Sequence, residues 1–107
     1  MKKSGLSRRN GLPMRVRWLK KAVRSLDKAM EYIAQEDEET ARIISDYIHM
    51  RVESLQEQSY QGRPGRIFGT RELVMGKYPF IVPYQVKNEE LQILRVFHTS
   101  RRLPDNW

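Results

Sequence analysis

Basic side chains and a histidine gather in the last third of the chain, and their types suggest proton-transfer and phosphate chemistry. Arg71, Arg95 and His98 fall on segments with strand-like patterns, and Arg101 follows the last of them. A histidine side chain can move a proton near neutral pH, and arginine offers a permanently charged, planar fork for phosphate oxygens. RNA self-cleavage needs both functions, because a 2′-hydroxyl must lose a proton and an anionic phosphorane must be stabilised. If the protein is a nuclease, these four residues are its predicted catalytic groups.

The same residues also have a structural interpretation, which the sequence supports about equally well. In that interpretation Arg95 forms an ion pair with Glu72 or Asp105, and His98 closes the edge of the core. Both interpretations stay open at this point.

Three further residues are predicted to bind a partner. Adjacent antiparallel strands lie about 4.8 Å apart, so Tyr84 can share a sheet face with arginines on neighbouring strands. Arg102 follows the last strand. Arg66 closes a basic turn, GRPGR, which either contacts phosphates or only ends the preceding helix.

Other kinds of site have little support in the sequence. The chain has no cysteine, and its two histidines have no metal-binding spacing, so His49 is expected to be a surface residue. Neither a GxxxxGK[ST] phosphate loop nor a GxSxG nucleophile motif occurs. We therefore expect no metal and no cofactor.

The net charge of +7 lies at the two ends of the 107-residue chain. Residues 1–13 carry four basic and no acidic side chains, whereas residues 62–107 carry eight basic and four acidic ones. Such a balance indicates either a polyanionic partner or a well-solvated surface. Residues 1–13 lack an apolar pattern and are expected to form a flexible basic extension before a single domain at residues 14–107. Without a membrane-length apolar run or a signal segment, a cytoplasmic protein with no membrane contact is expected.

The apolar spacing in the first half of the chain predicts one strand and two helices. Residues 14–18 alternate apolar and basic side chains, as a half-buried strand does. Residues 20–35 place apolar side chains at helical spacing. Asp37 then resembles an N-cap, and a second helical stripe continues to about residue 58. Because the link is short, the two helices should form an antiparallel hairpin.

The second half of the chain predicts strands. Short strands are expected at residues 66–68 and 71–74, a longer one at 80–86, and another at 91–98 after a polar hairpin turn. Pro79 and Pro83 indicate that the strand at 80–86 is irregular or has a side without ladder hydrogen bonds. The predicted fold is therefore α+β, with the helical hairpin on one face of a small antiparallel sheet and the other face open.

The segment GTRELVMGKYPFIVPYQVKNEELQILRVFHTSRRLP, at residues 69–104, resembles the C-terminal sheet of the RelE/ParE family of bacterial toxins. With the preceding strand and helices, the resemblance extends over about residues 14–104. It implies a growth-inhibiting toxin of a type II toxin–antitoxin module, held inactive in a hetero-oligomeric complex by a cognate antitoxin that wraps a flexible segment around it.

The resemblance implies one of two targets for the toxin. RelE-like members cut mRNA on the ribosome, whereas ParE-like members inhibit DNA gyrase without that catalytic set. Here Ile81 follows Phe80, where the RelE-type pattern often has an arginine, and no tyrosine matches the usual C-terminal one. His98 and Arg101 instead fit the H-x-x-R ending of many ParE-like members. Gyrase inhibition is therefore the favoured expectation, and a ribosome-dependent mRNA endoribonuclease is the alternative.

Overall fold

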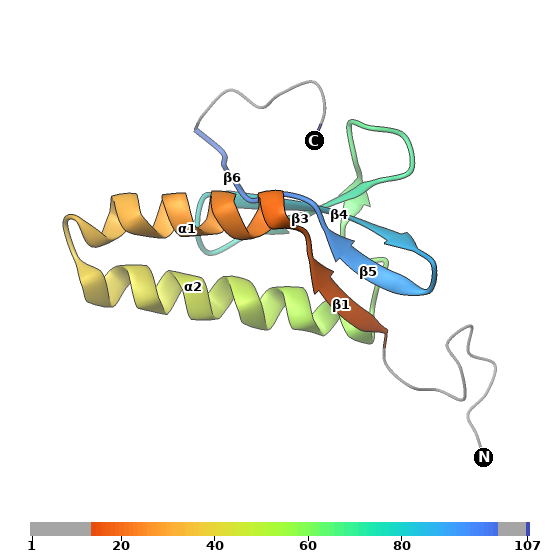
Figure 1. The fold of residues 1–107 in the computed structure, drawn as a ribbon, viewed down its shortest axis with the longest axis horizontal. Helices are drawn as coiled ribbons and strands as arrows, with labels where there is room; N and C mark the ends of the chain where they lie inside the picture. The colour runs from red at the N-terminus through yellow and green to blue at the C-terminus, as the bar shows by residue number, and fades with distance from the viewer. Residues whose placement is uncertain (1–13, 101–106) are drawn as a thin grey trace, which may run out of the picture.

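The computed structural model describes residues 14–100 and Trp107, and it has two layers, a helical hairpin and a sheet (Figure 1). The predicted extension at residues 1–13 and the residues Arg101, Arg102 and Asp105 lie outside the described part. None of the helices in residues 14–100 is long and apolar enough to cross a membrane. The elements are β1 (Arg15–Trp18), α1 (Lys20–Ala34), α2 (Glu38–Glu53), the 3₁₀ turn η2 (Ser54–Gln56), β2 (Arg63–Pro64), β3 (Arg71–Met75), β4 (Phe80–Lys87), β5 (Glu90–Ile93) and β6 (Phe97–His98).

The two predicted helices form, and each buries its apolar stripe. On α1 the buried residues are Ala22 and Leu26, and on α2 they include Ile44, Ile48 and Val52. The helices run side by side in opposite directions (Figure 1). Their stripes meet the apolar face of the sheet in one core.

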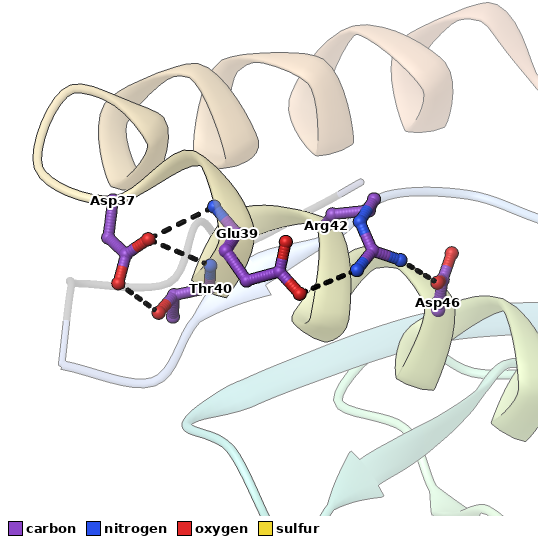
Figure 2. A network of polar contacts seen from close by, with 5 residues as sticks. All are labelled: Asp37, Glu39, Thr40, Arg42 and Asp46. Atoms are coloured by element: carbon purple, nitrogen blue, oxygen red, sulfur yellow. Dashed lines mark hydrogen bonds and ion pairs between the residues drawn. The ribbon is translucent and has the colours of Figure 1, made fainter.

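Asp37 caps the start of α2, as its position predicts (Figure 2). Its carboxylate accepts hydrogen bonds from the backbone N–H groups of Glu39 and Thr40, at 3.0 and 3.3 Å. It also accepts one from the Thr40 hydroxyl at 2.8 Å. These hydrogen bonds, led by the one from the Thr40 hydroxyl, lower the pKa of Asp37 because they stabilise its ionised form. The helix start therefore has an acceptor for two of its otherwise unpaired donors.

The sheet is mixed rather than purely antiparallel. Its order is β1-β5-β4-β3-β2, and β6 pairs with β4. The pairs among β2, β3, β4, β5 and β6 are antiparallel as predicted, but β1 runs parallel to β5, with Val16 opposite Leu91. A parallel pair requires a long crossover, and the helical hairpin is part of the segment between β1 and β5.

The segment expected as one strand at residues 91–98 is divided into β5 and β6. Both parts pair with the same side of β4, and the division faces Pro83. The carbonyl of Pro83 accepts a hydrogen bond from the Leu94 N–H at 2.9 Å, so its ring nitrogen points to that side as well. Because proline has no N–H to donate, the ladder cannot continue there. β4 therefore has ladder bonds on both sides, and the prediction of a side without them is wrong; the predicted irregularity is found at Pro83, where the ladder is interrupted.

Two smaller differences concern turns. Residues 66–68 form a loop, and the short strand lies earlier, at β2. The polar turn between β4 and β5 forms as predicted, with Asn88 and Glu89 at φ values of 55° and 62°. Two successive positive φ values match a tight hairpin turn whose twist fits that of the strands.

The sheet face opposite the helices is less open than predicted. At its centre Ile81, Pro83 and Gln92 are buried, and so is the carboxylate of Glu72. Only its margins remain exposed, for example at Val74.

Candidate functional site

The structure divides the predicted site residues between two places on the sheet. Arg71 lies opposite Tyr84 in the register of β3 and β4, whereas His98 on β6 lies opposite Phe80. Tyr84 and Phe80 are four residues apart on β4, which corresponds to about 14 Å along an antiparallel strand. The predicted catalytic residues Arg71 and His98 are therefore not brought together.

Tyr84 is fully buried and has a role inside the fold. Its hydroxyl donates a hydrogen bond to the Ser59 carbonyl at 2.7 Å and accepts one from the Gly62 N–H at 2.9 Å. Burial raises the pKa of Tyr84, because the charged phenolate loses solvation there. The Tyr84 side chain thus attaches the segment after η2 to the sheet. Tyr84 was predicted to bind a partner, but its burial leaves it no surface for such a contact.

Arg71 is also held by this segment. Its Nη1 donates to the Gly62 carbonyl at 2.7 Å, and its guanidinium carbon lies 5.5 Å from the centroid of the exposed Tyr60 ring. Both residues line a pocket of about 320 Å³ beside Met14. The arginine remains partly exposed, but one of its donors is already used.

Arg95 and His98 do share a pocket, of about 530 Å³, between α1 and β6. Lys28 and Tyr32 of α1 also line this pocket, and the described lining contains no acidic side chain. Lys28 and Tyr32 were not predicted as site residues, although their spacing of four places them on the same face of a charged helix. The pocket is therefore cationic and suits an anionic group.

Within this pocket His98 and Arg95 have different surroundings. Nδ1 of His98 lies 2.6 Å from the Ser100 hydroxyl, and the ring meets Phe80 edge-on at a centroid distance of 5.1 Å. Arg95 donates from Nη1 to the backbone oxygen of Trp107 at 3.3 Å, while its buried Nε has no hydrogen-bond partner among the described residues. Among the described residues Glu72 pairs with Arg63 and Arg66 and not with Arg95, so that half of the structural prediction is wrong, while the alternative partner Asp105 lies outside the described residues.

Glu72 instead forms the centre of a cluster with Arg63 and Arg66. Its Oε1 lies 3.0 Å from Nη2 of Arg63, and its Oε2 accepts from the backbone N–H of Arg66 at 3.0 Å and from its Nε at 3.4 Å. Burial acts to raise the pKa of Glu72, but the hydrogen bonds from Arg66 and Arg63 outweigh it and hold that pKa below its ordinary value. Arg66, predicted to bind a partner, therefore has an internal role through this carboxylate.

His49 is exposed on α2, as expected, and its ring lies 5.0 Å from that of Trp18. Arg101 and Arg102 lie outside the described residues. In the described ranges no group of three or more histidine, cysteine, aspartate or glutamate residues could hold a metal ion.

A third hollow, a groove, lies between the helices themselves. It has a volume of about 590 Å³, and its walls include Leu26 and Met30 of α1 and Ala41 of α2. Asp27, Glu31 and Asp46 also line it, with Arg42, which lies 3.4 Å from Asp46, so this groove combines apolar surface with mostly acidic side chains. Together with the cationic pocket, it gives α1 concave surfaces on two sides.

Comparisons with known proteins agree on one family of relatives. The family model for the ParE toxin of the type II toxin–antitoxin system parDE matches residues 16–103. A Sinorhizobium fredii (strain NBRC 101917 / NGR234) protein named "Putative toxin Y4kP" is 39% identical over 90 residues, which cover 84% of this chain and 93% of the relative. The solved chromosomal ParDE toxin–antitoxin system from P. aeruginosa includes a chain with 33% identity and a TM-score of 0.72, and the match covers 79% of this chain and 95% of that one.

Proposed function

Because this chain belongs to the ParE toxin family of type II toxin–antitoxin systems, we propose that it inhibits cell growth by inhibiting DNA gyrase in the cytoplasm. A cognate antitoxin neutralises it in a hetero-oligomeric complex. The observation that carries this proposal is the family match over residues 16–103, which includes both helices and strands β2 to β6.

The geometry of the basic residues supports inhibition by binding rather than by catalysis. Arg71 and His98 lie opposite positions four residues apart on β4, about 14 Å along the strand. A general acid or base must lie within hydrogen-bond reach of the group that it serves, and phosphate-stabilising cations must surround the same reacting atom. A binding inhibitor does not need such convergence.

The alternative, a RelE-like mRNA endoribonuclease that blocks translation, is favoured by one observation. Arg95, His98 and Lys28 line one cationic pocket, where they can approach a single phosphate. This candidate remains second, because the pocket lacks Arg71 and because Ile81 occupies the place of the usual arginine.

The concave surfaces along α1 suit the proposed antitoxin. A flexible segment that folds on binding needs grooves in which to bury apolar side chains, and its charges must complement the walls. The groove between the helices and the cationic pocket both provide apolar surface. Their charged side chains are mostly acidic in the groove and basic in the pocket.

A direct test uses purified gyrase and a relaxed plasmid. The full chain, made by cell-free synthesis, is added to a supercoiling reaction, and in parallel to a ribosome-dependent translation reaction. We expect supercoiling to be inhibited and the mRNA to stay intact. Cleaved mRNA with unaffected supercoiling would overturn the proposal in favour of the nuclease. Co-purification with the product of the neighbouring gene then tests the antitoxin.

A further inference from the structure

Phe68 lies in the loop between β2 and β3, and its side chain is fully exposed. We call residues 65–70 the Phe68 loop. It projects from the sheet away from the helical hairpin (Figure 1). None of the apolar contacts that stabilise the core involves this phenyl ring, so the described fold does not need it.

The loop is nevertheless held tightly by its own backbone. The N–H of Gly65 donates to the Thr70 carbonyl at 2.8 Å, and the N–H of Thr70 donates to the Ile67 carbonyl at 3.0 Å. The Thr70 hydroxyl donates to the same Ile67 carbonyl at 2.6 Å. Gly69 adopts a φ of 85°, a conformation that glycine takes at little cost. The backbone conformation of Gly69 thus determines how the chain turns beside Phe68.

The base of the loop is fixed by buried groups. The backbone N–H of Arg66 donates to the buried carboxylate of Glu72 at 3.0 Å. The indole N–H of Trp107 donates to the Thr70 hydroxyl at 3.4 Å, and the guanidinium carbon of Arg66 lies 5.7 Å from the Trp107 ring centroid. These bonds hold the backbone that carries Phe68, which lowers the backbone ordering entropy lost on binding.

We propose that Phe68 is an anchor that inserts into a preformed apolar pocket of the protein that the toxin inhibits. This inference rests on the proposed function, so that protein is DNA gyrase. An exposed aromatic side chain on a fixed support, next to arginines, has the character of a binding hot spot.

The shape of the loop favours the target over the antitoxin. A projecting side chain needs a partner that already has a cavity, as a large folded enzyme does. A flexible antitoxin segment has no such cavity before it folds, and it matches the grooves along α1 instead.

The charges on the loop favour a protein over a nucleic acid. Residues 63–72 carry three arginines and one glutamate. Arg63 and Arg66 pair with Glu72, and Arg71 donates to a backbone carbonyl, so their charges are partly engaged. Binding to phosphates depends on cations that are free to neutralise them. Because Arg63 and Arg66 share the single carboxylate of Glu72, some positive charge remains beside Phe68, and it would complement acidic side chains around the proposed pocket.

The test measures the affinity of gyrase for the full toxin chain and for three variants. Phe68→Ala should weaken binding about 10- to 100-fold, because burying a phenylalanine side chain contributes about 1.5–3 kcal/mol. Phe68→Leu, which keeps an apolar side chain, should lose much less. Met50→Ala is the matched control, since Met50 is an exposed apolar residue on α2, and it should bind gyrase like the unchanged chain. Circular dichroism and thermal unfolding confirm that each variant is folded.

The outcomes distinguish a failure of the Phe68 anchor from a failure of the proposed function. If the unchanged chain inhibits gyrase and Phe68→Ala inhibits it equally well, the anchor is overturned while the proposed function stands. If Phe68→Ala weakens binding to duplex DNA alone as much as it weakens binding to gyrase, the partner is a nucleic acid and the protein pocket is overturned. If the unchanged chain does not act on gyrase, the proposed function fails and this inference fails with it.

Discussion

The hydroxyl of Tyr84 lies 2.9 Å from the backbone nitrogen of Gly62, and this hydrogen bond joins the turn after the helices to the centre of the sheet. There is no room for a side chain at Gly62, because a Cβ atom there would lie 2.6 Å from a ring carbon of Tyr84. The same turn leads into β2 and the Phe68 loop. Tyr84 therefore supports the position of the loop from inside the core.

Replacing Tyr84 with Phe should destabilise the protein while leaving the packing of the ring unchanged. The Gly62 N–H and the Ser59 carbonyl would each lose a partner, and unpaired buried groups cost about 1–3 kcal/mol each. Urea unfolding followed by circular dichroism would measure the loss. Tyr60→Phe is the control, because Tyr60 is exposed and should change the free energy of unfolding by less than about 0.5 kcal/mol. Equal stability of the two variants would contradict the assigned role of Tyr84.

The stability contributed by Glu72 should depend on pH in a defined direction. The folded-state pKa of Glu72 is lowered, so its contribution is fully present above the pKa of the unfolded chain, near 4.5, and is lost as the pH falls through the folded value. Glu72→Gln should therefore be clearly less stable than the unchanged protein at pH 7, by about 1–3 kcal/mol, because it weakens hydrogen bonds to charged groups.

Thermal unfolding measured at intervals between pH 7 and pH 3 tests this expectation for Glu72. The difference between the two proteins should shrink as the pH falls below about 4.5, because the unfolded chain then binds a proton that the folded carboxylate resists. Glu36→Gln, at an exposed acidic position, should show little difference at any pH. A gap between Glu72→Gln and the unchanged protein that stays constant down to pH 3 would exclude the ion pairs as its cause.

Much of the fold could be predicted from the sequence, because it follows from local patterns. The stripe containing Ala22 and Leu26 and the cap at Asp37 need only neighbours within a few residues. The parallel pairing of Val16 with Leu91 could not be predicted, because strand periodicity shows which face is buried but not which strand lies alongside. The division of the last strand was indicated only indirectly, by Pro83.

The candidate site was harder to predict, because which side chains lie close together depends on the three-dimensional fold and not on sequence spacing. The alternation of Phe80, Val82 and Tyr84 already placed Tyr84 on the apolar face, so its burial could have been inferred. The partners of Glu72 could not, since many arginines are available and the sequence does not distinguish them. Similarly, the exposure of Phe68 depends on how its loop is held.

Gly69→Ala should destabilise the Phe68 loop through its backbone alone. No atom of the described residues lies within 4 Å of a Cβ placed at Gly69, so the cost comes from its φ of 85° and should be about 1–2 kcal/mol. Gly76→Ala is a matched control, because a Cβ there is equally free and its φ lies outside the left-handed region. That control should be neutral or slightly stabilising. Chemical denaturation of both variants would measure the difference, and equal stabilities would mean that the backbone at Gly69 relaxes without strain.

His98→Ala should leave toxicity intact if the protein inhibits gyrase by binding. In that case the imidazole only meets Phe80 edge-on and bonds to Ser100, so its loss affects stability modestly and inhibition very little. If the protein were a nuclease that uses His98 as general acid or base, the same change would lower its cleavage rate about 10²- to 10⁴-fold.

Expression of His98→Ala from a tightly controlled promoter, followed by growth curves and microscopy, gives the answer. Filamentous cells with a DNA-damage response, as with the unchanged toxin, would match gyrase inhibition. Normal growth of the His98→Ala strain, with the folded protein present at an equal level, would contradict the binding mechanism.

Arg71→Ala provides a second comparison, because Arg71 lies about 14 Å from His98 along the sheet and cannot share one reacting phosphate with it. Loss of function in both variants by a similar factor would indicate that the two groups act together after all.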